Sequence, residues 1–121
     1  MIDHIGLRTK QPDTMIAFYQ AALAPLGYTR LMEFEGTAGF GRERADIWVG
    51  PSDTSPTSQI HLALVADNHA AVDAFYAAAM AKGAKDNGGP GLRPEYTPTY
   101  YAAFVIDPDG NNLEVMCTTE G

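Results

Sequence analysis

The chain has 121 residues, of which 45% are apolar and 19% charged, a balance typical of one globular domain with its own core. The net charge of −7 argues against binding to nucleic-acid phosphates, and the single cysteine excludes an intramolecular disulfide or a cysteine-based zinc site. No apolar run approaches the roughly 20 residues that span a bilayer, and the N-terminus does not read as a signal peptide. We therefore expect one cytoplasmic domain over residues 1–121, with neither nucleic acid nor membrane as partner.

The first half of the chain predicts a strand, a helix and three more strands. The first strand is expected at Ile2–Arg8. Pro12 and Asp13 mark the start of a helix whose apolar residues recur at helical spacing, and Pro25–Gly27 marks its end. Short strands, separated by glycines and charged residues, are then predicted at Tyr28–Phe34, Gly36–Gly41 and Asp46–Gly50.

The second half, after a connection at Gly50–Ser58, predicts the same order of elements. A strand at Gln59–Ala66 precedes a helix that begins near Asp67 or Asn68 and ends at Gly83. A strong turn signal, "DPDGNN", separates the last two strands. The strands that follow the helix are predicted at Ala84–Asn87, Tyr100–Ile106 and Asn112–Cys117.

The two halves are copies of one unit. The offset that sets His4 over His61, 61 − 4 = 57, also sets "AFY" at Ala17–Tyr19 over "AFY" at Ala74–Tyr76. Each half is therefore a βαβββ module, one over about residues 1–50 and the other over about 58–121. We expect an α+β fold in which the paired modules form a mixed sheet around a concave cavity, with the helices outside.

Strand alternation predicts a metal site in this cavity. The large aliphatic residues of each strand should face the helices, which turns His4, His61 and Glu114 toward the concave side. Two imidazoles and a carboxylate suit a divalent cation such as zinc, nickel, manganese or iron, and three protein ligands leave positions open for substrate. In the alternative interpretation, the trio is a polar lining without affinity for metal.

Other residues are candidates for catalysis or ligand binding. Asp46 and Trp48 should face the cavity, Asp46 as a fourth ligand or a base beside the metal, and Trp48 as a ligand wall. Arg93, the cation of the long loop before the last two strands, suits anion recognition, and Tyr100 or Tyr101 could donate a hydrogen bond to a ligand. The alternatives are that Asp46 and Arg93 are solvated polar residues, and that Trp48 and one tyrosine belong to the core.

Three motifs resemble the vicinal oxygen chelate superfamily, also called the glyoxalase/bleomycin-resistance/dioxygenase group. They are "DHIGL" at Asp3–Leu7 with the "FY" helix after it, "IHLAL" at Ile60–Leu64 and "DPDGNNLEV" at Asp107–Val115. The resemblance covers essentially the whole chain. It implies paired βαβββ modules, metal ligands at His4, His61 and Glu114, and a homodimer that in some members completes the cavity.

The resemblance also implies a class of chemistry. The metal of such proteins holds two neighbouring oxygens of a substrate, so we expect Lewis-acid lyase or isomerase chemistry on a small oxygen-rich metabolite, with Glu114 and Asp46 in the catalytic site. The family's fourth ligand comes from the strand that matches Asp46–Val49. This chain offers only the shorter Asp46, or Trp48, which argues against lactoylglutathione lyase activity. The alternatives are a drug-binding or resistance protein without catalysis, and an iron-dependent dioxygenase.

Overall fold

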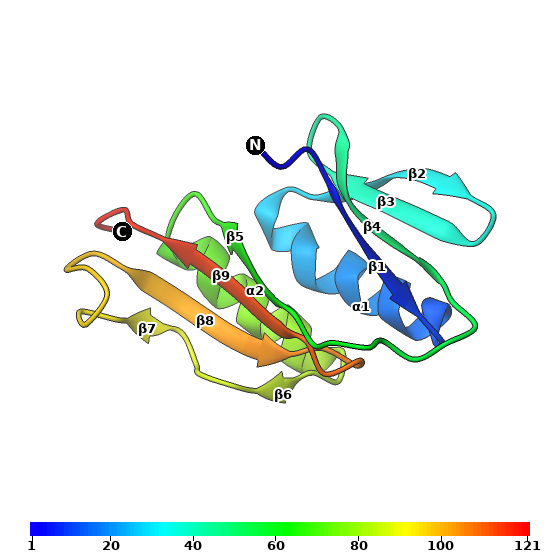
Figure 1. The fold of residues 1–121 in the computed structure, drawn as a ribbon. Coiled ribbons are helices and arrows are strands. Elements are labelled where there is room, and N and C mark those ends of the chain that lie inside the picture. The colour runs from blue at the N-terminus through cyan, green and yellow to red at the C-terminus, as the bar shows by residue number, and fades with distance from the viewer.

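A computed structural model describes residues 1–121 as two successive units, each a strand followed by a helix and further strands (Figure 1). The first unit contains β1 (Ile5–Thr9), α1 (Pro12–Leu23), a short 3-10 helix η1 (Ala24–Leu26), β2 (Thr29–Phe34), β3 (Thr37–Gly41) and β4 (Ala45–Pro51). The second contains β5 (His61–Val65), α2 (His69–Ala81), β6 (Lys85–Asp86), β7 (Gly91–Leu92), β8 (Tyr101–Ile106) and β9 (Asn112–Cys117). Neither helix has the length and apolarity needed to cross a membrane.

Each unit builds its own mixed sheet. The strand order is β1-β4-β3-β2 in the first sheet and β5-β9-β8-β6 in the second, where β7 also pairs with β8. In both sheets the first strand of the unit runs parallel to the last one, and the remaining pairs are antiparallel. The predicted α+β fold of two βαβββ modules is therefore confirmed, with the short β7 as an additional strand in the second module and the strands divided between two sheets within the chain.

Both helices pack on the same side of the sheets and against each other (Figure 1). The apolar stripe of α1, which includes Phe18, and that of α2, which includes Phe75, face Phe40 and Val105 from the sheets in one continuous buried cluster. Burial of these large side chains provides the main driving force for folding. The faces of the sheets that point away from the helices are not covered by the core, so they are available to form a functional site.

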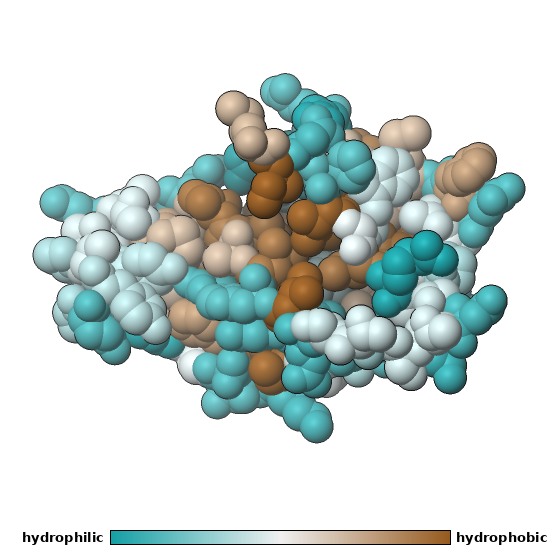
Figure 2. All heavy atoms as spheres, viewed as in Figure 1, coloured by the Kyte–Doolittle hydropathy of each residue, from teal (hydrophilic) through white to brown (hydrophobic).

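The face of the sheets opposite the helices carries exposed apolar side chains. Figure 2, which has the same view as Figure 1, shows brown residues gathered in the middle of this face. Val65 at the end of β5 is 71% exposed, and Ile2 before β1 is 81% exposed. Contiguous exposed apolar surface of this kind commonly marks an interaction site.

The sequence predicted each long element to within a few residues, with two differences that matter for the site. β1 begins at Ile5, so His4 precedes the strand and is not held by its hydrogen bonds. The loop after α2 contains β7, a two-residue strand at Gly91–Leu92, which is too short to produce a periodic pattern. Tyr100 lies just before β8, in this same loop.

Candidate functional site

The centre of the candidate site is a buried carboxylate beside an exposed imidazole. The parallel register of β5 and β9 pairs Ala63 with Glu114, which brings His61, two residues earlier on the same face, next to the Glu114 side chain. The distance between His61 Nε2 and Glu114 Oε1 is 2.8 Å. The side chain of Glu114 is only 3% exposed, whereas that of His61 is 54% exposed. The pair thus presents one nitrogen and one oxygen donor at the edge of the second sheet.

Tyr100 occupies the other oxygen of Glu114. Its hydroxyl donates a hydrogen bond to Glu114 Oε2, and the ring of Tyr96 packs edge-on against it with centroids 5.1 Å apart. Burial, together with the hydrogen bond and negative charge of Glu114, raises the pKa of Tyr100 to about 12. The phenol therefore stays protonated at neutral pH and remains a donor to the carboxylate.

Phe104 and Arg93 form the wall beside this pair. Phe104 on β8 lies opposite Glu114 in the register, and its ring centroid is 6.2 Å from that of His61. The Arg93 guanidinium lies 5.4 Å from the Phe104 centroid and donates to the backbone oxygens of Gly89 and Gly91, both at 2.8 Å. Phe104 was not among the predicted site residues. Side chains alternate along β8, so Phe104 points away from the face of its neighbour Val105, which is in the core, and lies on the same face as Glu114.

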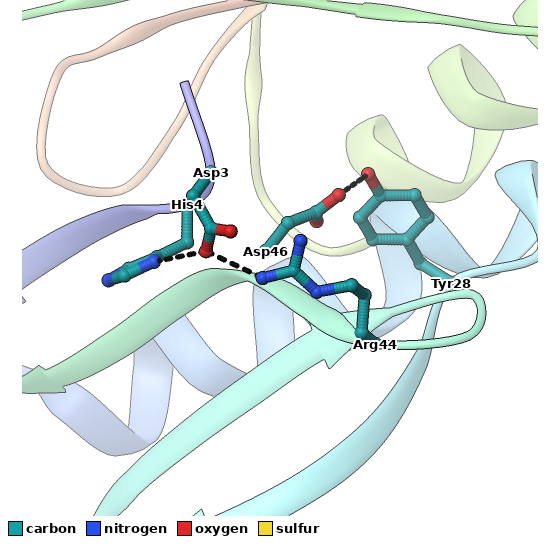
Figure 3. Close-up of polar contacts among 5 residues, drawn as sticks. All are labelled: Asp3, His4, Tyr28, Arg44 and Asp46. Carbon is teal, nitrogen blue, oxygen red and sulfur yellow. Dashed lines mark hydrogen bonds and ion pairs between the residues drawn. The ribbon is translucent and has the colours of Figure 1, made fainter. Parts of the chain in front are cut away.

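His4 lies in the other module and takes part in a different set of contacts (Figure 3). Its Nδ1 is 2.8 Å from Asp3 Oδ1, and the same oxygen accepts a hydrogen bond of 2.6 Å from Arg44. The Arg44 and His4 hydrogen bonds hold the pKa of Asp3 at about 2, so this carboxylate is ionised at neutral pH. Nε2 of His4 is left without a hydrogen bond.

The three predicted metal ligands do not meet within one chain. No three side chains among the histidines, aspartates, glutamates and the cysteine are arranged to hold a metal ion together. The prediction that strand alternation would bring His4 to His61 and Glu114 assumed one joined sheet. The two modules instead form separate sheets, so the first contributes one imidazole and the second contributes the imidazole and carboxylate pair.

The side chain of Asp46 makes its hydrogen bond within the first module. Its Oδ2 accepts a 3.0 Å hydrogen bond from Tyr28, and burial together with this bond raises the pKa of Tyr28 to about 12 (Figure 3). Asp46 lines a cavity of about 410 Å³ with Tyr28, Arg42, Glu43, Arg44, Leu64 and Val65. The prediction of Asp46 as a fourth ligand or a base beside the metal stays a prediction; in the structure its Oδ2 is engaged by the Tyr28 hydroxyl.

Trp48 lines a second cavity in the first module. The register of β1 and β4 pairs Gly6 with Trp48, as that of β5 and β9 pairs Ala63 with Glu114. Trp48 therefore stands at the position that Glu114 occupies in the second module, and an indole cannot bind a metal. The cavity has a volume of about 510 Å³ and is lined by His4, Gly6, Arg8, Phe34, Glu35, Thr37, Trp48 and Pro51.

Tyr101 points away from the site. Its hydroxyl donates a 2.6 Å hydrogen bond to Asp73 on α2, and its ring stacks on His69 with centroids 3.8 Å apart. Tyr100 and Tyr101 are neighbours at the start of β8, and successive side chains of a strand point to opposite faces. The prediction that Tyr101 binds substrate stays a prediction; at Glu114 it is the neighbouring Tyr100 that takes the face of the carboxylate.

Comparison with known families gives one match, to the Glyoxalase/Bleomycin resistance protein/Dioxygenase superfamily, over residues 1–115. No curated protein sequence is similar enough to this chain to count as a match. The family match includes both modules and Glu114, and it ends within β9.

Solved structures show the same architecture. A glyoxalase/bleomycin resistance protein from Albidiferax ferrireducens T118 is 22% identical, with a TM-score of 0.82, and the alignment covers 95% of this chain and 97% of that one. A glyoxalase/bleomycin resistance protein/dioxygenase family enzyme from Burkholderia phytofirmans PsJN is 21% identical (TM-score 0.72; 98% of each chain). Lactoylglutathione lyase from Agrobacterium tumefaciens is also 21% identical (TM-score 0.69; 97% of this chain and 92% of that one). At these identities the likeness establishes a shared fold.

Proposed function

Because the chain belongs to the Glyoxalase/Bleomycin resistance protein/Dioxygenase superfamily, we propose that it binds a divalent metal ion and acts as a lyase or isomerase on a small oxygen-rich metabolite. The observation that carries this proposal is the buried Glu114 carboxylate, held 2.8 Å from the exposed His61 imidazole. Burying a carboxylate is unfavourable unless its charge is paired, so the position of Glu114 favours a positively charged partner. An imidazole and a carboxylate together suit zinc, nickel, manganese or iron.

One chain brings together two of the three protein ligands that such a metal site needs. His61 and Glu114 supply two donors, and a catalytic ion of this type takes about three protein ligands. The third donor proposed is His4, whose Nε2 carries no hydrogen bond. Since His4 belongs to the other sheet, we infer that a second copy of the chain supplies it, so that each site combines His61 and Glu114 with His4 of the partner subunit.

The uncovered face of the sheets supports this homodimer. The face opposite the helices carries His61 and Ala63 on β5 and ends in the exposed Val65. Apolar side chains gather in the middle of that face (Figure 2). A symmetric dimer that buries it uses the same surface on both copies, and two equivalent sites then arise from the reciprocal contact.

The residues of the site have distinct roles in the proposed reaction. His61, Glu114 and His4 of the partner subunit would hold the ion, which when bound supplies Lewis-acid stabilisation of negative charge on substrate oxygens. Tyr100 positions the Glu114 carboxylate by holding Oε2. Phe104 forms an apolar wall beside His61, and Arg93, held over that wall, is available to bind a negatively charged group of the substrate.

Metal analysis of protein purified without a metal-affinity tag tests the proposal. Wild type loaded with zinc, nickel, manganese or iron should retain the ion after gel filtration, and His61→Ala should lose it. His69→Ala is a matched control, because the third histidine stacks on Tyr101 away from Glu114 and should leave metal content unchanged. Wild type that retains none of the four ions would contradict the proposal. Loaded protein is then assayed with a glutathione hemithioacetal and with epimerisable hydroxy acids.

A second candidate function is binding of a small molecule without turnover. The cavity of about 510 Å³ beside Trp48 favours it, because its volume lies in the range typical of ligand sites and it contains an aromatic wall. A protein of this kind would bind its ligand equally well with the His61→Ala substitution. The same variant should be inactive if the protein is a metal-dependent enzyme.

A further inference from the structure

We propose that the cavity beside Trp48 binds a planar aromatic ligand that carries a carboxylate. This ligand class is a candidate for the substrate of the proposed metal-dependent reaction. Only that assignment to the reaction rests on the proposed function. The binding itself depends on Trp48, Gly6, Gly39 and Arg8, which lie in the first module; of the proposed metal ligands, only His4 lines this cavity.

Two glycines shape a slot beside the indole. Gly39 on β3 pairs with Trp48, and a Cβ atom there would lie 2.8 Å from Cζ3 and 2.9 Å from Cη2 of the ring. The missing side chain therefore lets the indole lie directly against β3. On the other side of Trp48, a Cβ atom at Gly6 would meet no atom within 4 Å, so the space over β1 is open. The cavity next to the ring is thus floored by backbone rather than filled by side chains.

The walls of this slot are aromatic. Trp48 is half-buried, and Phe34 at the end of β2 lines the same cavity with 68% of its surface exposed. A large apolar ring that stays exposed at a cavity is available to a ligand, and aromatic pairs gain from offset-stacked or edge-to-face contact. A flat ring fits a space bounded by an indole and by the backbone of Gly6, whereas a puckered ring of equal size is thicker.

Arg8 supplies the recognition of the carboxylate. It follows Gly6 on the same face of β1, and its side chain makes one hydrogen bond, from Nε to the oxygen of Pro51 at 2.7 Å. No carboxylate of the chain pairs with it, so the terminal guanidinium nitrogens can donate to an anion in the forked geometry that carboxylates favour. Glu35 lines the same cavity, and its negative charge repels an anion. Removing the charge of Glu35 should therefore strengthen carboxylate binding, whereas removing that of Arg8 should weaken it.

Trp48 is the only tryptophan, so its fluorescence reports directly on this cavity. We would titrate benzoate into metal-free wild-type protein in EDTA, with cyclohexanecarboxylate and benzyl alcohol as probes that lack the planar ring or the charge. Benzoate should change the fluorescence in a saturable way, with a Kd at least about tenfold below that of either control probe. Equal responses to all three probes, or no saturable response to benzoate, would overturn the proposal.

Variants then locate the binding. Arg8→Gln should weaken benzoate binding about tenfold, and Glu35→Gln should strengthen it about threefold, because they remove opposite charges from the same cavity. Gly6→Val should abolish binding by filling the slot. Gly89→Val is its matched control, since a Cβ atom at Gly89 also meets nothing within 4 Å, but it lies in the second module. Binding that survives Gly6→Val, with folding checked by circular dichroism, would contradict the placement.

The same titration separates this inference from the proposed function. It is run without metal and repeated on His61→Ala, in which benzoate binding should be unchanged. If metal analysis succeeds and benzoate fails to bind, the ligand class is wrong and the metal proposal stands. If benzoate binds as expected and no ion is retained, the cavity is confirmed and the metal-dependent reaction is overturned.

Discussion

At the scale of single residues, Glu114 is the side chain on which the candidate site depends. It is almost fully buried, and its two oxygens are engaged by different groups, His61 at Oε1 and Tyr100 at Oε2. The loss of a hydrogen-bond donor to a buried carboxylate destabilises the folded state, because water does not replace the lost hydrogen bond. Tyr100 should therefore contribute to stability as well as to the orientation of the carboxylate.

The substitution Tyr100→Phe should lower the free energy of unfolding by about 1–3 kcal/mol, since it leaves Oε2 of Glu114 without its donor. Urea unfolding at neutral pH measures this difference. Tyr96→Phe is the control. Tyr96 lies in the same loop, its hydroxyl makes no hydrogen bond, and phenylalanine keeps the ring that packs against Tyr100. An equal effect of both substitutions would mean that the Tyr100 hydroxyl does not support Glu114.

Two tyrosines also predict a loss of stability in alkali. The pKa values of Tyr28 and Tyr100 are raised from 10.0 to about 12, by burial first and then by the carboxylates of Asp46 and Glu114. In the unfolded chain these groups ionise near 10, so their stabilising effect is complete below pH 10 and is lost as pH rises toward 12. The free energy of unfolding of wild type should fall across that interval. Tyr28→Phe should reduce the fall, and an unchanged profile would contradict the assignment.

At the scale of elements, the turn between β8 and β9 positions Glu114. Asp107 in this turn is buried and accepts hydrogen bonds from the backbone of Asp109 at 2.8 Å and of Asn111 at 2.9 Å. Its second oxygen accepts from the Asn111 amide at 2.9 Å and from the Tyr19 hydroxyl of α1 at 2.6 Å. The helix of the first module therefore anchors the turn that begins β9 in the second.

Removing this anchor should destabilise the fold. Tyr19→Phe leaves a buried carboxylate with one donor fewer, so the free energy of unfolding should fall by about 1.5–3 kcal/mol. Tyr76→Phe removes a comparable bond of 2.9 Å to Asp86 at the surface and should change it by about 0.5 kcal/mol or less. Urea unfolding of both variants checks the difference. Comparable losses would show that burial of the Tyr19–Asp107 bond adds nothing.

The elements also show what a single sequence can predict. The two helices and the strands of the core were predicted because apolar residues such as Phe18 and Val115 repeat with the period of their element. The His61–Glu114 pair was found because alternation in two long strands determines which face a side chain takes. β7 was missed because two residues show no period, and Phe104 was missed although alternation could have identified it.

The positions of His4 and Asp46 could not be predicted in the same way. Both lie at ends of strands, where neighbouring groups decide the direction of the side chain: Asp3 for His4, and Tyr28 for Asp46 (Figure 3). Their relation to Glu114 also depends on how the two sheets sit against each other, and local periodicity contains no information about that. The periodicity of the sequence therefore predicted the helices and strands of each module better than it predicted a site that needs residues from both modules.

At the scale of the whole molecule, the uncovered face of the sheets should be the dimer interface. Val65→Asp places a charge on that face, at the end of β5, and should shift the protein to monomer in light scattering coupled to gel filtration. Ala77→Asp is the control, because Ala77 is exposed on α2, on the other side of the sheets. A wild-type monomer, or an equal effect of both substitutions, would contradict the proposed interface.

The central claim is that each metal site combines two copies of the chain, and complementation between two inactive variants tests it most directly. We would co-express His4→Ala and His61→Ala chains with two peptide tags that bind no metal, and purify the mixed dimer over both. Each variant alone should bind no ion. The mixed dimer should bind about half as much as wild type, because one of its two sites then has both histidines and Glu114. A mixed dimer that binds no ion, while the wild type does, would contradict a site shared between copies.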